Sequence, residues 1–149
     1  MKPSTTSDER MPKLVVFDLD YTLWDMWIDT HVTGPLRREK NTHNEILDKH
    51  GEVISFYNHV PQILHRLREA GVKIAVASRT SAPTLKIHEK TGIPYEEMVF
   101  YDDEHRNKET EQLGVTFCLV RRQMDHDTFE KGLAEWRRRH PAPPQEDEE

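Results

Sequence analysis

Four short apolar runs constrain the fold of this chain more than any other feature. Each run ends in polar residues, and the four are LVVFDLD (14–20), KIAVASRT (73–80), MVFYDDE (98–104) and VTFCLVR (115–121). Continuous apolar residues rich in β-branched side chains are typical of strands that are buried on both faces of a parallel sheet. The runs therefore predict four strands of one parallel sheet.

Helical patterns fill the gaps between these predicted strands. Apolar residues before the second strand have the i, i+3, i+4, i+7 spacing of a helix face: Val60, Ile63, Leu64 and Leu67. Pro61 near the start of this helix and Gly71 past its end agree with the prediction. Further helices are expected over 83–92, over 105–113 and near the end of the chain, where the apolar face comprises Phe129, Leu133 and Trp136. Alternating strands and helices predict an α/β fold with a small doubly wound parallel sheet.

The segment EILDKHGEVISFY (45–57) departs from this alternation. Two short apolar runs flank His50 and Gly51, which predicts a β-hairpin, although these turn residues also allow a loop. Because the segment follows the first strand, we expect it to lie over the end of that strand. We predict a single domain over 12–140, with disordered polar ends at 1–11 and 141–149.

Charge and cysteine content exclude several classes of partner. A net charge of −6 over 149 residues gives no electrostatic footprint for nucleic acid or an anionic membrane. No apolar run approaches the roughly 18 residues that span a bilayer, and the N-terminus lacks the apolar core of a signal peptide. The single cysteine, Cys118, fits a reducing compartment. We expect a cytoplasmic protein, with the nucleus as an alternative location.

Polar side chains of a distinctive kind follow three of the predicted strands. They are Asp18 and Asp20 after the first, Ser78, Arg79 and Thr80 after the second, and Asp102 and Asp103 after the third. A lone aspartate after a strand is more typical of a helix cap or a turn. Ligands of open parallel sheets, however, bind outside the carboxyl ends of the strands, so we expect these groups to converge. Clustered carboxylates need a cation, and Mg²⁺ takes oxygen ligands while retaining water for a phosphate substrate.

These residues also resemble a known family. DLDYT (18–22), SRT (78–80) and FYDDE (100–104) are similar to motifs I, II and IV of the haloacid dehalogenase (HAD) superfamily. The longer stretches VVFDLDYTLWDMWIDTHV (15–32) and VFYDDEHRN (99–107), together with KTGIP (90–94), resemble the magnesium-dependent phosphatase-1 group within it. The resemblance implies the Rossmann-like three-layer fold of that superfamily, without a cap domain apart from a small β-hairpin flap.

The resemblance implies catalytic roles for residues of the first motif. Asp18 would be the nucleophile that forms an aspartyl-phosphate. Asp20 would be the acid that protonates the leaving oxygen and then the base that activates water. Thr22 would steady the loop after the nucleophile.

The resemblance also implies a binding role for residues of all three motifs. The carboxylate of Asp18, the backbone carbonyl of Asp20 and Asp103 would hold Mg²⁺, with Asp102 supporting this site. Ser78 and Arg79 would bind the phosphoryl oxygens, because phosphoryl transfer depends mainly on positioning and on neutralising the equatorial oxygens.

The resemblance fails between the second and fourth motifs. The superfamily carries a lysine there, motif III, which neutralises the nucleophile and the phosphoryl group and which lies in a longer segment than this chain has. The KTGIP match resumes soon after Thr80, so we expect this lysine to be missing. Lys86 is the better substitute, and Lys90 is the other candidate. The sequence therefore predicts a phosphatase of reduced activity.

Three functions are compatible with the sequence. The first is a Mg²⁺-dependent phosphomonoester hydrolase with an open site for phosphotyrosine or for a phosphorylated sugar such as a fructosamine phosphate, both associated with the resembled group. The second is a pseudophosphatase that acts as a binding module, and the third transfers the phosphoryl group to an acceptor other than water. Trp24 and Trp27, just after the nucleophile, either line the substrate entrance or pack in the core.

Overall fold

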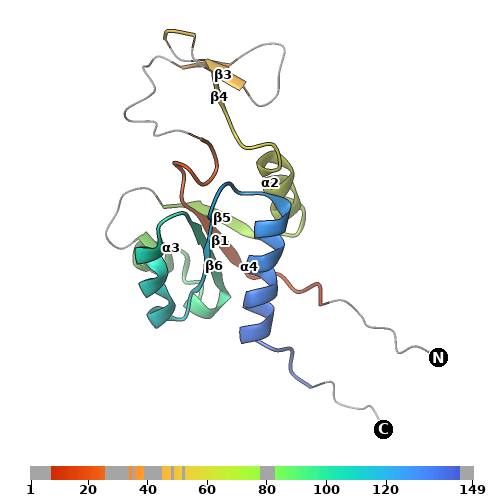
Figure 1. The fold of residues 1–149 in the computed structure, drawn as a ribbon. Helices are drawn as coiled ribbons and strands as arrows, with labels where there is room; N and C mark the ends of the chain where they lie inside the picture. Colours follow the sequence, from red (N-terminus) through yellow and green to blue (C-terminus); the bar gives the residue numbers. More distant parts are fainter. Residues whose placement is uncertain are drawn as a thin grey trace, which may run out of the picture.

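The computed structural model describes residues 8–25, 34, 36–38, 45–47, 49–51, 53–77 and 83–144. Its central element is a parallel sheet of four strands in the order β5-β1-β6-β7 (Figure 1). The strands are β1 (Leu14–Phe17), β5 (Lys73–Val76), β6 (Met98–Asp102) and β7 (Thr116–Leu119). Each predicted apolar run thus contributes one strand, and the predicted parallel α/β sheet is confirmed.

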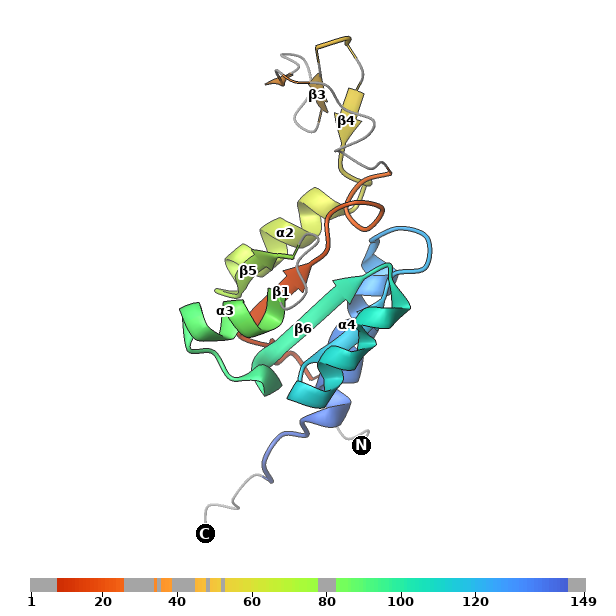
Figure 2. The same ribbon diagram turned by 90° about the vertical axis from the view of Figure 1, so that its left-hand side faces the viewer.

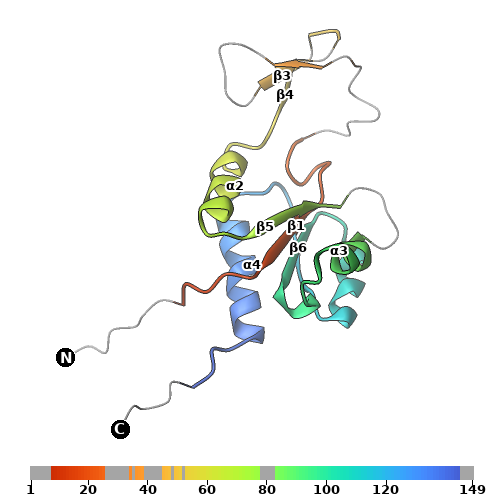
Figure 3. The ribbon, with the colours of Figure 1, turned by 180° about the vertical axis from the view of Figure 1, so that it is seen from behind.

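Helices cover both faces of this sheet, as predicted. Helices α2 (Val60–Glu69) and α4 (His126–Arg139) lie on one face, and α3 (Pro83–Thr91) lies on the other (Figure 3). A short 3-10 turn, η1 (Tyr95–Glu97), precedes β6. The segment η2 (His105–Leu113) also forms a 3-10 helix, in which no residue is buried. A 3-10 geometry suits it because HRNKETEQL offers no apolar stripe to anchor an α-helix on the sheet.

The core consists of two layers that share the central strands. Val15 and Phe17 of β1 face α2 and α4, where they pack with Ile63 and Leu67 on one helix and with Phe129, Leu133 and Trp136 on the other. Leu14 and Val16, which alternate with them, pack on the opposite face with Met98, Phe100 and Phe117. Alternation follows from the two-residue period of a strand. Strands β1 and β6 are therefore buried on both faces, as predicted.

Strand β5 differs from this prediction. The run KIAVASRT predicts a strand buried on both faces, yet Ile74 is 40% exposed and Val76 is 56% exposed, so that prediction is wrong. Within the described residues β5 pairs with β1 alone, and it forms one edge of the sheet. Its apolar composition resembles that of β1, but an edge position leaves part of each side chain without neighbours.

A second, smaller sheet stands beyond the carboxyl ends of the main strands (Figure 2). It contains β2 (Arg37–Arg38), β3 (Glu45–Leu47) and β4 (Val53–Ser55), all antiparallel. Strands β3 and β4 form the hairpin predicted for 45–57, and Gly51 adopts a φ of 79° in its turn. Strand β2 has no counterpart in the sequence prediction. None of the helices in the described part of the chain has the length and apolarity that a membrane span requires.

Candidate active site

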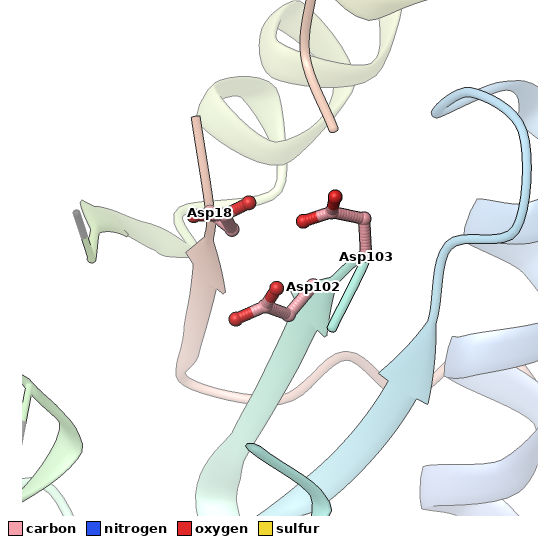
Figure 4. Close-up of side chains that lie close together, drawn as sticks. All are labelled: Asp18, Asp102 and Asp103. Atoms are coloured by element: carbon pink, nitrogen blue, oxygen red, sulfur yellow. The ribbon is translucent and has the colours of Figure 1, made fainter. Parts of the chain in front are cut away.

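Three carboxylates meet where the two central strands end. Asp18 follows β1, Asp102 is the last residue of β6, and Asp103 comes directly after it. Phe17 and Tyr101 are register partners, so the residues that follow them leave the sheet side by side. One oxygen from each of the three aspartates lies within 4.8 Å of the other two (Figure 4). The convergence that the parallel sheet predicts is therefore present for these three residues.

Burial and mutual repulsion change the acidity of this cluster. Burial, followed by the neighbouring carboxyl groups of Asp103 and Asp102, raises the pKa of Asp18 from 3.8 to about 8. The Thr22 hydroxyl opposes this rise by donating a hydrogen bond of 3.1 Å to Asp18 Oδ2. Burial also raises the pKa of Asp102 to about 6. Since the three charges are poorly tolerated together, the cluster fits a hard divalent cation such as Mg²⁺.

The protein already binds both oxygens of Asp102. Its Oδ1 accepts the backbone N–H of Glu104 at 2.9 Å, and its Oδ2 accepts the Asn107 side-chain amide at 2.6 Å. Its side chain is only 3% exposed, whereas Asp18 and Asp103 are half-buried. Asp18 and Asp103 thus offer more accessible oxygens to a cation. This geometry is compatible with the predicted supporting role of Asp102, which stays a prediction.

A tight loop follows the candidate nucleophile. The backbone N–H groups of Thr22 and Leu23 both donate to the carbonyl of Leu19, at 3.2 and 2.9 Å. Tyr21 adopts a φ of 60°, a left-handed conformation that is uncommon for residues other than glycine. Thr22 is completely buried, and its carbonyl accepts the N–H of Met124 at 3.1 Å. The loop is therefore anchored both to itself and to the segment before α4.

Asp20 lies in this loop, outside the group of three carboxylates. Its Oδ1 accepts a hydrogen bond of 2.9 Å from the indole Nε1 of Trp24. The Trp24 ring in turn packs against Phe56, with the ring centroids 5.7 Å apart. The Asp20 carboxylate is therefore held by the indole of Trp24, and its role in proton transfer stays a prediction.

Other predicted site residues are not brought to this cluster. Ser78 and Arg79 lie outside the described residues. Lys86 belongs to α3 and its side chain is exposed, as is that of Lys90 near the end of the same helix. No described contact links either lysine to the three aspartates.

Sequence reasoning missed the interactions of two aromatic residues, Tyr57 and Trp24. Burial raises the pKa of Tyr57, and the charges of Asp25 and Asp103 raise it further. The sequence indicates Trp24 as an entrance or core residue, but it does not predict the hydrogen bond to Asp20. No sequence signal for this bond was available, because the turn between Asp20 and Trp24 is not helical and Tyr21 within it has a φ of 60°.

Comparison with known proteins agrees with this site. The sequence model of the acid phosphatase family matches residues 10–86 and 84–139. A HAD-like hydrolase superfamily protein of Schizosaccharomyces pombe is 44% identical in an alignment 144 residues long, gaps included, that covers 71% of this chain and 84% of the relative. Magnesium-dependent phosphatase 1 of Homo sapiens is 38% identical in an alignment 154 residues long, gaps included, that covers 83% of this chain and 86% of the relative.

These matches extend over most of the chain and of each relative. They agree with the parallel α/β sheet and with the group of Asp18, Asp102 and Asp103, whose oxygens are suited to Mg²⁺. A phosphatase acts on a phosphorylated substrate, and the carboxyl ends of β1 and β6 are where such a substrate would meet the metal. The chain therefore belongs to the magnesium-dependent phosphatases of the HAD superfamily.

Proposed function

We propose that this protein hydrolyses phosphomonoesters through an aspartyl-phosphate on Asp18, with Asp20 as the acid and base and with a rate reduced by the lack of the motif III lysine. One observation carries the proposal: the Asp18, Asp102 and Asp103 carboxylates converge at the ends of β1 and β6. Burial, followed by the neighbouring Asp103 and Asp102 carboxyl groups, raises the pKa of Asp18 to about 8, so an ionised Asp18 needs a positive charge beside it. Asp18, Asp103 and the Asp20 carbonyl would hold Mg²⁺, which would supply positive charge to keep Asp18 ionised and to polarise the phosphoryl group.

The first half-reaction moves the phosphoryl group to the protein. A carboxylate oxygen of Asp18 attacks phosphorus, and the bond between phosphorus and the leaving oxygen breaks. The proton of the Asp20 carboxyl group passes to that leaving oxygen, so an alcohol departs. Thr22 holds the other side of the nucleophile, because its hydroxyl donates to Asp18 Oδ2 at 3.1 Å.

The second half-reaction restores the protein. Asp20, now a carboxylate, takes a proton from water as the water oxygen attacks phosphorus. The bond between phosphorus and the Asp18 oxygen breaks, inorganic phosphate leaves, and Asp18 is again a carboxylate. Asp20 has then regained the proton that it gave away, so the cycle balances. Ser78 and Arg79 are proposed to bind the phosphoryl oxygens during both steps.

Two features of the comparisons support the absence of a segment in this chain. The two matches to the acid phosphatase family meet at residues 84–86, in the first turns of α3 and shortly after β5. The alignment with the human phosphatase runs over 154 residues, which is more than the 149 of the whole chain, so that relative carries residues with no counterpart here. We propose that the motif III lysine is among them, and that Lys86 or Lys90 substitutes for it incompletely.

We propose phosphotyrosine or a phosphorylated sugar, including fructosamine phosphates, as the substrate class. Aromatic residues around the loop of Asp20 support the aryl class in particular: Trp24 donates to Asp20 and packs on Phe56, and the backbone N–H of Tyr57 donates to the Leu23 carbonyl. Comparison of kcat/KM for a phosphotyrosine peptide and for a fructosamine phosphate separates the two classes, because kcat/KM measures differential binding of the transition state. A preference of less than about 10-fold would leave the aromatic residues without a role in selection.

The test is hydrolysis of p-nitrophenyl phosphate in Mg²⁺ and in chelator. We expect turnover that depends on the metal and that falls by at least about 10³-fold in Asp18→Asn, since loss of a nucleophile removes the covalent route. Asp127→Asn is the matched control, because Asp127 is an exposed aspartate of α4 paired only with Lys131 among described residues. In Asp20→Asn, we expect the phosphorylated form of the peptide that contains Asp18 to accumulate, as detected by mass spectrometry.

The pseudophosphatase is the alternative that the split family match favours. It predicts no turnover in the wild type while Mg²⁺ still raises the melting temperature. Lys86→Ala refines the result, because a loss of rate in this variant identifies Lys86 as the substitute for the missing lysine. An unchanged rate in Lys86→Ala assigns that role to Lys90 or to neither residue.

A further inference from the structure

We infer that Trp24 is a positioning residue for the proton transfer by Asp20, and that Phe56 fixes the Trp24 ring in place. This inference rests on the function proposed above. The indole Nε1 donates to Asp20 Oδ1 at 2.9 Å, within the normal range for a charge-assisted hydrogen bond. The bond holds one oxygen of the carboxylate that is proposed to exchange a proton with the substrate.

Backbone hydrogen bonds close the loop that carries Asp20. Its turn is closed by backbone bonds to Leu19, and Tyr21 within it has a φ of 60°. These bonds fix the backbone of the turn, but they do not set the two side-chain torsions of Asp20. The indole N–H restricts those torsions, and orientation of a catalytic group contributes directly to its rate.

Trp24 is itself held by the segment that leads from the small sheet to α2. Phe56 directly follows β4, and its ring lies 5.7 Å from that of Trp24, at an angle of 31°. The next residue, Tyr57, donates its backbone N–H to the carbonyl of Leu23 at 2.8 Å. Two contacts thus fasten this segment to the loop, one at the Leu23 carbonyl and one at the Trp24 ring.

The leaving group distinguishes positioning from a merely structural role. As the phosphoryl group transfers to Asp18, the proton of Asp20 moves to the leaving oxygen while the bond between phosphorus and that oxygen breaks. An alkoxide requires this proton, whereas p-nitrophenolate leaves without it. Since kcat/KM reports the first half-reaction, a misplaced Asp20 lowers kcat/KM for an alkyl phosphate and has little effect on an activated aryl phosphate.

The first experiment measures kcat/KM of Trp24→Phe with glycerol 2-phosphate and with p-nitrophenyl phosphate. Phenylalanine keeps an aromatic ring against Phe56 but lacks the N–H donor. General acid catalysis contributes about 10²–10⁴-fold, so we expect a loss of about 10-fold on the alkyl substrate and of less than about 3-fold on the aryl substrate. Phe56→Leu should show the same selectivity with a smaller loss. Equal losses on both substrates, or none, would overturn the inference.

Asp20→Asn keeps this result separate from the proposed function. If Asp20→Asn lowers the alkyl rate selectively but Trp24→Phe does not, the inference fails and the proposed role of Asp20 stands. If Asp20→Asn itself shows no selective loss, the proposed role of Asp20 fails and the inference fails with it.

A spectroscopic test does not require Trp24→Phe to fold. The test compares ¹H–¹⁵N spectra of the wild type and of Asp20→Ala. In the variant, we expect the signal of the Trp24 indole N–H to shift and its proton to exchange faster with solvent. Trp136 is the internal control, since its Nε1 donates to the Glu96 carbonyl at 2.8 Å, on another part of the molecule. A Trp24 resonance that moves no more than that of Trp136 would contradict the hydrogen bond.

Discussion

The two central strands and the edge strand β5 contribute to the same end of the sheet from very different surroundings. Every residue of β1 and β6 is buried, and these strands end in Asp18, Asp102 and Asp103. Strand β5 is mostly exposed, with Ile74 at 40% and Val76 at 56%, and the chain continues from it toward Ser78 and Arg79. The three carboxylates therefore follow the most buried strands of the main sheet, β1 and β6. The candidate phosphate-binding residues come after β5, the least buried strand of that sheet.

This difference shows how such a chain can lose one part of a site and keep another. Asp18 and Asp103 are fixed by strands that pack on both faces, so their positions do not depend on the connection after β5. The N–H of Asp18 is bound by the Tyr101 carbonyl at 2.9 Å, which ties the two central strands together beyond their regular pairing. The proposed shortening of the connection after β5 would change the edge of the sheet and leave the three carboxylates in place.

The largest effect is expected from restoring the connection after β5. We expect insertion of the corresponding segment of a relative between β5 and α3 to raise kcat on p-nitrophenyl phosphate by about 10²–10³-fold, the usual value of one charge-neutralising donor. The control is the same insertion with its lysine changed to methionine, which should give little of the gain. No difference between the two insertions would contradict the proposed loss of the lysine.

Two matched valine substitutions compare the strands directly. Val99 in β6 is completely buried and Val76 in β5 is 56% exposed. We expect Val99→Ala to lower the free energy of unfolding by about 2–3 kcal/mol, through lost burial and a residual cavity, and Val76→Ala to lower it by less than about 0.5 kcal/mol. Urea denaturation of the two variants and the wild type measures both values. Similar losses would mean that β5 is covered in solution.

The cluster of Asp18, Asp102 and Asp103 should make the metal-free protein less stable as pH rises. The pKa of Asp18 is about 8 in the folded protein and ordinarily 3.8, so between these values the unfolded chain releases a proton that the folded protein retains. Stability then falls as pH increases, and Asp102, with a pKa of about 6, acts in the same direction over a narrower window. Glu135 acts in the opposite direction, but its pKa is lowered from 4.5 to about 2 by its arginine partners, so its contribution changes only at more acidic pH.

Thermal denaturation in chelator between pH 5 and pH 8 measures this effect. Each kcal/mol lost lowers the melting temperature of a domain of this size by about 2–4 °C. We expect Asp18→Asn to remove most of the slope and Asp127→Asn to retain it. Mg²⁺ should stabilise the wild type more at pH 8 than at pH 5, because it binds the ionised carboxylates. A melting temperature that stays constant over this range without metal would contradict the raised pKa of Asp18.

Sequence patterns predicted the central strands β1 and β6 well, for a physical reason. A strand buried on both faces must be apolar throughout, so the runs LVVF and MVFY predict such strands. Parallel pairing of these strands then brings Asp18 and Asp102 together. The run KIAV is equally apolar, yet it forms an edge. Position within a sheet is a property of the whole fold, and composition does not encode it.

The orientation of Asp20 was beyond sequence reasoning for a related reason. The hydrogen bond from Trp24 depends on a turn in which Tyr21 has a φ of 60°. Tyrosine rarely adopts this left-handed conformation, and its side chain gives no indication of a positive φ. The motif therefore identified Asp20 as a candidate, while the group that holds it became visible only in three dimensions.

The smallest expected effect concerns the exposed edge itself. Strand β5 begins with Lys73, but its residues 74–76 carry no charge, and charged residues on natural edge strands block pairing with a second chain. Val76→Lys adds such a charge at a position that is 56% exposed. We expect the free energy of unfolding to change by less than about 0.5 kcal/mol, because few contacts are lost. We also expect weaker self-association at high protein concentration, measured by sedimentation, whereas Val53→Lys, at an exposed position of the small sheet, should not reduce it. If both variants associate like the wild type, the β5 edge is not a contact surface, and the comparison between the strands then concerns stability alone.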